Sequence, residues 1–418
     1  MRLSGNHIKF ALIACCSILA SLVANAKAWH VGPKEKLHSI QQAIDLAKAG
    51  DTIFVESGLY QEKTITVNKQ VYLIGVGMPV LDGEKKFEVL AIKSNGVLVE
   101  GFFVEHSGYS SYNDIAGIRI YNSRNVVIRR NRLEDTFFGI YSQHASNCTI
   151  EENTLHSNAI NEITSANAIH CWKSDSMRII NNTVSGHRDG IYFEFVTNSL
   201  ISGNLSTGNV RYGLHFMFSH NNTYLQNKFI NNGAGVAVMY SHNVRMYNNT
   251  FSDNWGGAAY GILLKEISDS HVEGNTFLRN TTAIYMEGTT RIKVIHNNFR
   301  NNGWAMKVQA SCNDNSFTGN NFTGNSFDVS TNGTLVLNTY NGNYWDKYEG
   351  YDLNRDGVGD VPYRPVSMYA MIAERNPATM MLFRSFMVSL LDKTEKLIPA
   401  LTPENLKDDQ PSMKMVKW

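Results

Sequence analysis

The sequence predicts an all-β protein folded as one long, single-stranded right-handed parallel β-helix, with an N-terminal capping helix and a C-terminal helical extension. A small residue followed by an aliphatic one recurs about every 22 residues from Gly117 onward. An asparagine followed two residues later by an apolar residue recurs with the same period, from Asn131 to Asn320. The intervening segments alternate apolar and polar residues with period two, which is typical of short strands. Because two independent markers keep one period, we expect stacked turns of a solenoid.

The character of the sequence changes at three places, so we expect four regions along the 418 residues. The segment boundaries follow the end of an apolar leader, the end of the repeat and the start of an apolar helical stretch. The four regions are a signal peptide (1–28), the right-handed parallel β-helix (29–335), an aromatic and acidic cap (336–366), and a helical docking segment with a tail (367–418).

The first region has the features of an export signal. Arg2 and Lys9 supply positive charge, and the apolar stretch Phe10–Val23 is too short for a comfortable membrane span. Small residues at 24–28 offer cleavage sites, so we expect cleavage near Lys27 or Trp29 and a periplasmic mature protein. A lipoprotein signal ending at Cys15 is the second interpretation.

Composition excludes several classes of function. The formal net charge of +1 gives no basic footprint for nucleic acid. Three of the five cysteines lie outside the leader, too few and too scattered for a disulfide framework. Alternation places Cys148 and Cys171 inside the solenoid, and Cys312 is expected in the same turn column as His220 and His242.

A short amphipathic helix is predicted over residues 38–49, where it would cover the open N-terminal end of the core. Ser39 is a suitable N-cap and Gly50 a suitable end. One face would be apolar: Ile40, Ala43, Ile44 and Ala47.

The repeat predicts which residues form the core. Residues that follow the small residue of each turn should stack as one inward apolar column: Ile118, Ile140, Ile169, Ile191, Leu214, Val236, Ile262, Ile284 and Met306. The recurring asparagine is expected to form a ladder at a turn, since asparagine tolerates left-handed backbone and bonds its neighbours.

The cap contains a candidate calcium loop, DLNRDGVGD at 352–360. Its oxygen-bearing residues occupy positions 1, 3, 5 and 9 of such a loop: Asp352, Asn354, Asp356 and Asp360. Tyr363 stands where the bidentate glutamate belongs. A structural calcium and a loop bonded only to itself are both open.

An apolar helix is predicted to follow the cap, with Asn376 as N-cap and Pro377 in the first turn. Arg384 in its middle argues against a membrane span. Its apolar residues form the candidate docking surface for a partner: Met380, Phe383, Met387, Leu390 and Leu391. The tail from Asp408 is polar and is expected to be mobile.

The outward columns bring together soft metal ligands. Met217 and Met239 fall on adjacent turns in one column, next to His215, and His220 and His242 stack one turn position further along. Thioether and imidazole ligands together favour monovalent copper. Ordinary packing or contact with a partner is the alternative for the same residues.

Two other functions must be weighed. Parallel β-helices often process acidic polysaccharides, and one cluster could supply a base and a charge neutraliser to a lyase or epimerase of uronate polymers: His187, Arg188, Asp189, Tyr192, Glu194 and His215. However, no recognised acid–base motif and no basic groove are evident, and His170 is expected to be an outward structural residue. A purely structural or adhesive solenoid is the third possibility.

Specific segments resemble a known family. They are GLHFMFSHN (213–221), GVAVMYSHN (235–243), AAYGILLKE (258–266), NYWDKYEGYDLNRDGVGDVPYRP (343–365) and RNPATMMLFRSFMVSLLDKTEKLIPAL (375–401). Together they are similar to the NosD family, periplasmic β-helical accessory proteins of nitrous oxide reductase. The resemblance spans essentially the whole mature chain, and it agrees with a pectin-lyase-like solenoid.

The resemblance implies a function in copper-site maturation. NosD-like proteins work with an ATP-binding-cassette transporter (the NosF ATPase and the NosY permease) and the copper chaperone NosL, and help to assemble the copper–sulfide centre of NosZ. It also implies that the apolar C-terminal helix docks on the permease at the membrane surface. No enzymatic activity of the chain itself is expected.

Overall fold

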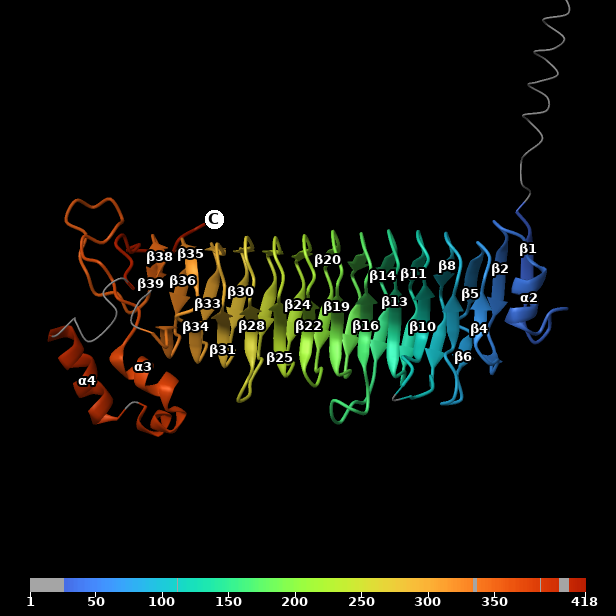
Figure 1. The fold of residues 1–418 in the computed structure, drawn as a ribbon, viewed down its shortest axis with the longest axis horizontal. Helices are drawn as coiled ribbons and strands as arrows, with labels where there is room; N and C mark the ends of the chain where they lie inside the picture. Colours follow the sequence, from blue (N-terminus) through green and yellow to red (C-terminus); the bar gives the residue numbers. More distant parts are fainter. Residues whose placement is uncertain (1–25, 111, 334–336, 384, 398–405) are drawn as a thin grey trace, which may run out of the picture.

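The chain forms a straight parallel right-handed β-solenoid, which confirms the predicted fold class (Figure 1). The computed structural model describes residues 26–110, 112–333, 337–383, 385–397 and 406–418. Most of the predicted signal peptide therefore lies outside the described residues. In the described part of the chain, the turns build three parallel sheets of 14, 12 and 13 strands.

The 14-stranded and the 13-stranded sheets consist mainly of strands of three residues. The 14-stranded sheet contains β1 (Ala28–Val31), β2 (Thr52–Glu56), β5 (Tyr72–Val76), β8 (Leu98–Glu100), β11 (Val127–Arg129), β14 (Thr149–Glu151), β17 (Arg178–Ile180), β20 (Leu200–Ser202), β23 (Thr223–Leu225), β26 (Arg245–Tyr247), β29 (His271–Glu273), β32 (Lys293–Ile295), β35 (Asn313–Thr318) and β38 (Leu337–Asn341). The 13-stranded sheet contains β3 (Leu59–Tyr60), β6 (Val80–Asp82), β9 (Phe103–Glu105), β12 (Arg132–Glu134), β15 (Thr154–His156), β18 (Thr183–Ser185), β21 (Leu205–Thr207), β24 (Lys228–Ile230), β27 (Thr250–Ser252), β30 (Thr276–Leu278), β33 (Asn298–Arg300), β36 (Asn321–Thr323) and β39 (Tyr344–Trp345).

The third sheet has the longest strands and carries the candidate site. It contains β4 (Ile65–Val67), β7 (Leu90–Ile92), β10 (Ala116–Tyr121), β13 (Phe138–Gln143), β16 (Asn167–Trp172), β19 (Asp189–Glu194), β22 (Tyr212–Met217), β25 (Ala234–Met239), β28 (Tyr260–Lys265), β31 (Thr282–Glu287), β34 (Trp304–Val308) and β37 (Phe327–Ser330). We call it the long-strand sheet. Long loops precede β10, β16 and β28, at the edge from which the C-terminal helices also project (Figure 1).

The predicted inward column is confirmed. Its nine members are fully buried, and the strand register places each directly over the next, from Ile118 to Met306. A second inward column is aromatic. Its neighbouring rings stack with centroids 4.0 to 5.4 Å apart: Phe229, Phe251, Phe277, Phe299, Phe322 and Trp345.

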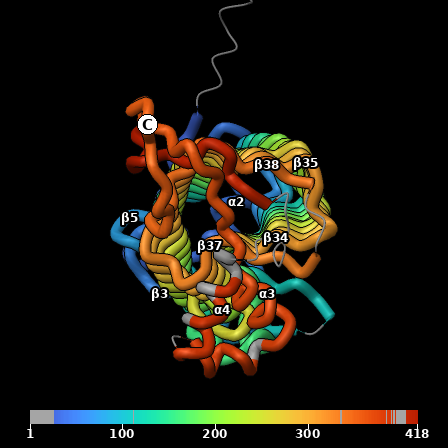
Figure 2. Tube along the Cα trace, turned by 90° about the vertical axis from the view of Figure 1, so that its left-hand side faces the viewer, coloured from blue at the N-terminus to red at the C-terminus, as the bar shows by residue number. Residues whose placement is uncertain are grey.

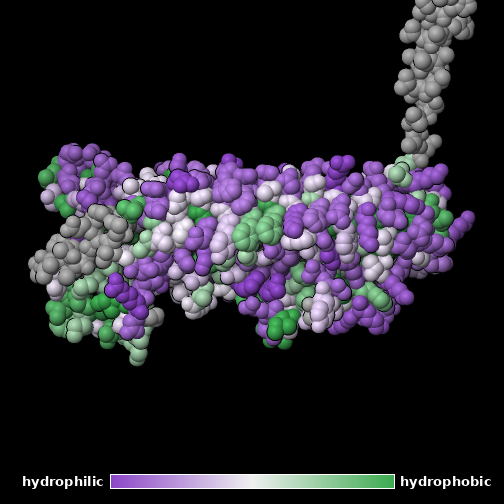
Figure 3. All heavy atoms as spheres, viewed as in Figure 1, coloured by the Kyte–Doolittle hydropathy of each residue, from purple (hydrophilic) through white to green (hydrophobic). Residues whose placement is uncertain are grey.

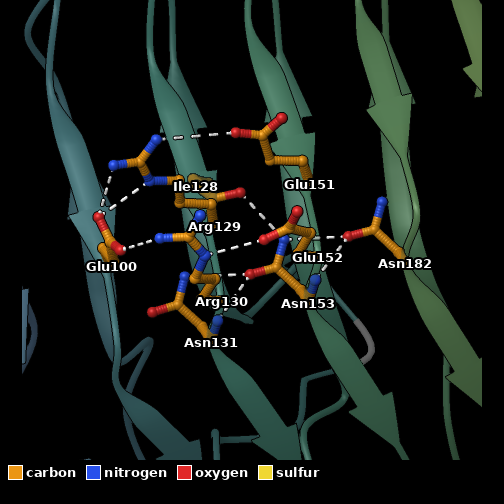
Figure 4. A network of polar contacts seen from close by, with 9 residues as sticks. All are labelled: Glu100, Ile128, Arg129, Arg130, Asn131, Glu151, Glu152, Asn153 and Asn182. Carbon is orange, nitrogen blue, oxygen red and sulfur yellow. Dashed lines mark hydrogen bonds and ion pairs between the residues drawn. The ribbon is translucent and has the colours of Figure 1, made fainter.

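The predicted asparagine ladder is also confirmed. In each step the Oδ1 of one asparagine accepts from the backbone N–H and the Nδ2 of the asparagine one turn earlier, as Asn153 does from Asn131 at 3.0 and 3.1 Å. Figure 4 shows these steps beneath an outer row of ion pairs that join Arg129 and Arg130 to Glu100. The ladder satisfies polar groups that the core would otherwise bury without partners.

A second asparagine ladder, which the sequence analysis missed, lies at the turn before the long-strand sheet. It runs through Asn209, Asn232, Asn254, Asn280, Asn302 and Asn325. The preceding turn carries His187 at the same position, and its backbone N–H donates to Asn209.

The N-terminal capping helix has the predicted cap and face. It is α2 (Ile40–Leu46), and the Ser39 side chain accepts from the backbone N–H of Gln42. The four predicted apolar residues are buried against the first turns. The helix ends earlier than predicted, with Ala47 as its C-cap, and Gly50 adopts a φ of +91° beyond that end, a conformation that favours glycine.

The predicted single C-terminal helix after Asn376 is wrong, because the structure divides it into two helices, and a further helix that was not predicted precedes them. In chain order the three helices are α3 (Met368–Arg375), the 3₁₀ helix η1 (Pro377–Leu382) and α4 (Phe386–Leu397). Asn376 caps η1 as predicted, with its side chain accepting from Ala378. The boundary between α3 and η1 follows from Pro377, which lacks an N–H and disfavours helix at the preceding residue.

These helices pack on the outer face of the last strands of the long-strand sheet (Figure 2). Trp304 and Phe327 stack with centroids 4.1 Å apart, and Tyr369 and Phe383 lie against Phe327. Lys307 forms an ion pair of 2.6 Å with Glu374 of α3. No helix in the described residues is long and apolar enough to cross a membrane.

The prediction of a mobile tail is wrong. Residues 406–418 return to the solenoid, where Asp408 is fully buried and accepts from Asn343 and Trp345. Further along, Val416 exchanges hydrogen bonds with Asn321, and the Trp418 ring stacks on His296. The tail is therefore part of the C-terminal cap.

Candidate functional site

The register of the long-strand sheet brings the two predicted methionine ligands together. Met217 ends β22, Met239 ends β25, and the parallel pairing places them directly opposite each other. Both side chains point outward and are half-buried. Adjacent strands lie about 4.8 Å apart, so two flexible thioethers at these positions can reach one ion.

Two histidines stack in the turn that follows these strands. The rings of His220 and His242 have centroids 3.9 Å apart and planes inclined by 15°. Burial, together with the neighbouring His242, lowers the pKa of His220 below its ordinary value. The His220 ring therefore stays neutral, and able to bind a metal, at a lower pH than a free imidazole. We call Met217, Met239, His220 and His242 the methionine ledge.

His215 lies deeper than the methionine ledge. It is 5% exposed, and its ring contacts those of Tyr192 and Tyr212, each with centroids 4.8 Å away. Burial lowers its pKa to about 4, with a partly opposing effect from Asp189. Neither ring nitrogen has a hydrogen-bond partner among the described residues. His215 thus differs from the half-exposed histidines of the ledge.

An exposed aromatic stack that was not predicted from the sequence lies beside the ledge. Phe195, Phe218 and Tyr240 follow directly after the last residues of β19, β22 and β25, with positive φ values. Their rings stack in turn with centroids 5.2 and 5.0 Å apart. The repeated pattern FEF, FMF and VMY in the sequence was the available signal.

One expected position is corrected by the register. Asn313, and not Cys312, continues the turn column of His242, because the bridges run from His242 through Ser268 and Thr290 to Asn313. The step from Thr290 to Asn313 is 23 residues, one more than the usual 22. Cys312 therefore lies one residue before the turn column, where its side chain is buried. Cys148 and Cys171 are buried as predicted, and burial raises the pKa of both thiols.

The candidate calcium loop is bonded to itself in the structure. The Asp352 carboxylate accepts from the backbone N–H groups of Asp356 and Gly357, at 3.2 and 2.9 Å. Asp360 accepts from Leu353 at 2.7 Å, and the Asn354 amide donates to Asp356 at 2.9 Å. This arrangement accounts for the loop without an ion, and calcium at these four residues stays a prediction.

Besides the buried His215 described above, the residues of the lyase or epimerase hypothesis fall into two groups. His187 and Asp189 are fully buried, and Asp189 forms a bidentate pair with Arg211 at 2.9 and 2.6 Å. Arg188, Tyr192 and Glu194 line a surface cleft of about 530 Å³ on the long-strand sheet. Two long loops, around residues 109–114 and 162–166, form the sides of this cleft.

One further group of possible metal ligands occurs in the described part of the chain. Donor atoms of Asp82, Glu105 and His106 all lie within 4.8 Å of one another. The Nδ1 of His106 is 3.1 Å from Asp82 and 3.8 Å from Glu105. The three side chains therefore already satisfy one another as an ion-paired cluster.

The predicted docking residues are divided by the helical extension. Phe383 packs into the interface with the solenoid, whereas Met380, Met387 and Leu390 are exposed and Leu391 is half-buried. Met381 and Phe386, not predicted, are the most exposed apolar side chains of this segment, at 92% and 83%. Figure 3 shows hydrophobic colour gathered at this end of a largely hydrophilic face.

Comparison with known families supports the resemblance. Residues 160–350 match a family model described as periplasmic copper-binding protein (NosD), and residues 83–168 match one described as right handed beta helix region. The chain is 25% identical over 174 residues to the probable ABC transporter binding protein NosD of Stutzerimonas stutzeri, a match that covers 37% of this chain and 40% of that protein. The protein of the same description from Pseudomonas aeruginosa is 26% identical over 147 residues, covering 35% and 30%. The matches thus span less than half of these curated relatives.

Solved structures share the solenoid. The A-module of mannuronan C-5 epimerase AlgE6 from Azotobacter vinelandii has a TM-score of 0.52 at 17% identity, over 73% of this chain and 93% of that one. The catalytic domain of a GH87 alpha-1,3-glucanase in complex with nigerose has a TM-score of 0.61 at 13% identity, over 77% and 69%. At these identities the likeness concerns the fold alone. With the family match and the solenoid together, the resemblance expected from the sequence is confirmed: the chain is similar to NosD-type proteins, whose family model is described as periplasmic and copper-binding.

Proposed function

We propose that this protein is a periplasmic maturation factor that binds monovalent copper and helps to assemble the copper–sulfide centre of nitrous oxide reductase. The observation that carries the proposal is the methionine ledge, where Met217 lies opposite Met239 and two stacked imidazoles follow three residues later on the same two turns. Two thioethers and a neutral imidazole form a soft donor set that suits monovalent copper. The half-exposed position allows the ion to be released again to a partner.

We propose that the copper is cargo, received from a NosL-type chaperone and passed on toward NosZ. Weak, exposed ligation supports a transfer function, since a fully buried site would hold the ion too long. His215 lies two residues before Met217 on the same face of β22, so we keep it as a proposed copper ligand. Because its side chain is buried, the surrounding rings would have to shift before it could bind an ion.

We propose further that the C-terminal helices dock on a NosF/NosY-type transporter. The exposed apolar side chains of η1 and α4 support this, as does the description of the curated relatives as transporter binding proteins. An apolar surface on helices that project from the end of the rod suits a permease at the membrane surface.

The test is a competition titration of the purified mature protein with monovalent copper and a coloured chelator. The Met217→Leu/Met239→Leu double variant keeps side-chain volume and removes both thioethers, so we expect at least about a tenfold weaker copper affinity. Met246→Leu is the matched control, because this methionine is fully buried in the core. Equal affinity of the double variant and the wild type would remove the site assignment.

A lyase or epimerase of uronate polymers is the second candidate, and the cleft beside β19 favours it. Its charge does not suit a polyanion, because three carboxyl groups (Asp114, Glu162 and Glu194) outnumber the two guanidinium groups that line it. Incubation with polyuronates distinguishes the two functions. A lyase would create unsaturated ends and an epimerase would invert residues, whereas the copper function predicts neither product.

A further inference from the structure

The cleft on the long-strand sheet is lined by residues with buried nitrogen donors that make no hydrogen bond to the described residues. His170, on β16, is 8% exposed and lines the cleft, and its Nε2 has no partner among the described residues. The buried Nε of Arg188, on the cleft wall, also lacks a hydrogen bond within the described chain, and its nearest charged partner is the Asp189 carboxylate at 3.8 Å. A buried donor without a partner costs free energy, so such groups point to a ligand.

A polar relay sets the protonation of His170. The Oδ1 of Asn167 accepts from Arg188 at 3.0 Å, so the amide Nδ2 faces the Nδ1 of His170 at 3.1 Å and donates to it. With Nδ1 as acceptor, the proton of the neutral ring is on Nε2. Burial and the nearby Arg188 keep the pKa of His170 far below its ordinary value, which agrees with a neutral ring. The neutral His170 ring therefore carries one N–H donor, at the buried Nε2 of a residue that lines the cleft.

Acceptors and aromatic rings lie around these donors. Glu194 lines the same cleft, and burial raises the pKa of its carboxyl group. Phe138 contacts the His170 ring with centroids 5.4 Å apart, and Tyr192 contacts it at 4.8 Å. The cleft thus combines fixed donors, carboxylate acceptors and apolar ring faces in a volume of about 530 Å³, within the usual range for a small-molecule site.

This combination matches one class of ligand. A sugar hydroxyl accepts one hydrogen bond and donates another, so it can accept from His170 and donate to Glu194. The C–H faces of a pyranose ring are apolar and pack on aromatic rings. In addition, turns repeat every 4.8 Å or so along the cleft, close to the length of one pyranose unit in a linear chain.

The charge of the cleft selects among saccharides. Arg211 is paired with the buried Asp189 and lies 3.8 Å from Glu162, so Arg188 is the one other guanidinium group in a lining that carries three carboxyl groups. An anionic sugar would be repelled by this surplus of acid. We infer that the cleft binds a neutral oligosaccharide, a function beyond the proposed copper binding and on different residues.

The experiment is isothermal titration calorimetry of the full mature protein with neutral hexasaccharides, namely cellohexaose, maltohexaose and chitohexaose, and with hexagalacturonate. We expect at least one neutral hexasaccharide to bind and hexagalacturonate to bind more weakly. His170→Phe keeps the ring packing and removes the Nε2 donor, and Glu194→Gln removes the charged acceptor. Each should weaken binding about tenfold.

Glu287→Gln is the matched control, because Glu287 lies four turns further along the same outward column, outside the cleft, and should leave saccharide affinity unchanged. Absence of binding by every neutral hexasaccharide would overturn the inference, and so would binding that His170→Phe and Glu194→Gln both leave unchanged. The Met217→Leu/Met239→Leu variant should bind saccharide normally, so failure of the copper proposal and failure of this one are distinguishable.

Discussion

The carboxylate of Asp408 occupies the place of the next asparagine after Asn343, and thereby ends the first asparagine ladder. Its Oδ2 accepts from the backbone N–H of Asn343 at 3.0 Å and from the Asn343 Nδ2 at 2.9 Å, the pattern of every earlier step. The same oxygen accepts from the indole of Trp345, and Oδ1 accepts from Gly342. A residue 65 positions away in the chain thus closes the solenoid.

Asp408→Ala should destabilise the C-terminal turns. The change leaves three buried donors on Asn343 and Trp345, and a part-buried one on Gly342, without an acceptor, which should cost about 2 to 4 kcal/mol. Hydrogen exchange should show faster exchange of the amides of residues 342–345, while the first turns of the solenoid are unchanged. Asp409→Asn, an exposed neighbour whose carboxylate pairs with Lys407, is the control. Equal protection of these amides in Asp408→Ala and wild type would contradict the capping role.

Asn249→Ala should be among the more destabilising single changes in the middle of the rod. The Asn249 side chain accepts from Asn227 and donates to Tyr224 and Asn275, and all of these groups are buried. Losing it should cost about 3 kcal/mol or more, because its partners stay buried and unpaired. Thermal unfolding measures the effect. The exposed Arg245→Ala of the same turn should be nearly neutral, and a comparable loss in both variants would refute the ladder as a source of stability.

His187 should make stability depend on pH. Burial, followed by the positive charge of His156, lowers its pKa to about 3. In the unfolded chain the His187 ring takes up a proton below about pH 6.5, whereas in the folded chain it stays neutral until about pH 3. Protonation therefore favours the unfolded chain between these two pH values. The contribution of His187 to the unfolding free energy is complete above pH 6.5 or so and is lost as the pH falls toward 3.

His187→Asn should remove this part of the acid sensitivity. An asparagine there continues the second ladder, since Oδ1 of Asn209 can accept from a new amide as it does from the His187 backbone. Urea unfolding between pH 7 and pH 4 measures the slope. Burial raises the pKa of Asp328 to about 6, so this residue changes the unfolding free energy with pH in the opposite direction. The effect is the same in both proteins and cancels in the comparison. A slope that His187→Asn leaves unaltered would count against the assignment.

Met381→Ser/Phe386→Ser should weaken association with the transporter and leave the fold intact. Both side chains are almost fully exposed, so replacing them removes apolar contact area without opening a cavity. Co-purification of the transporter from detergent-solubilised cells should fall several-fold, with an unchanged melting temperature. Phe383→Ser is the contrasting variant, because Phe383 packs on Phe327 and its loss should loosen the helices themselves. Undiminished co-purification of the double variant would exclude this surface as the dock.

The solenoid was predictable because its determinants are local and periodic. Alternation of apolar residues selects the inward side chains, and a constant period stacks them, so the register from Ile118 to Met306 and the opposition of Met217 and Met239 follow directly. The same counting failed at Cys312, where one extra residue in a turn shifted the column.

The C-terminal cap was not predictable in the same way. The contact of Asp408 with Asn343 joins residues far apart in sequence, and no period relates them. The polar composition of the tail predicted that it would lie in solvent. The burial of the Asp408 carboxylate depends instead on several donors that only the tertiary structure brings to it. The cleft at His170 was missed for a similar reason, because two loops without any repeat enclose it.

The most direct test of the proposed copper function is X-ray absorption spectroscopy of the mature protein loaded with one equivalent of monovalent copper. The account predicts sulfur and imidazole nitrogen scatterers around the copper in the wild type, and loss of the sulfur scatterers in Met217→Leu/Met239→Leu. Sulfur scattering that persists undiminished in the double variant would contradict it.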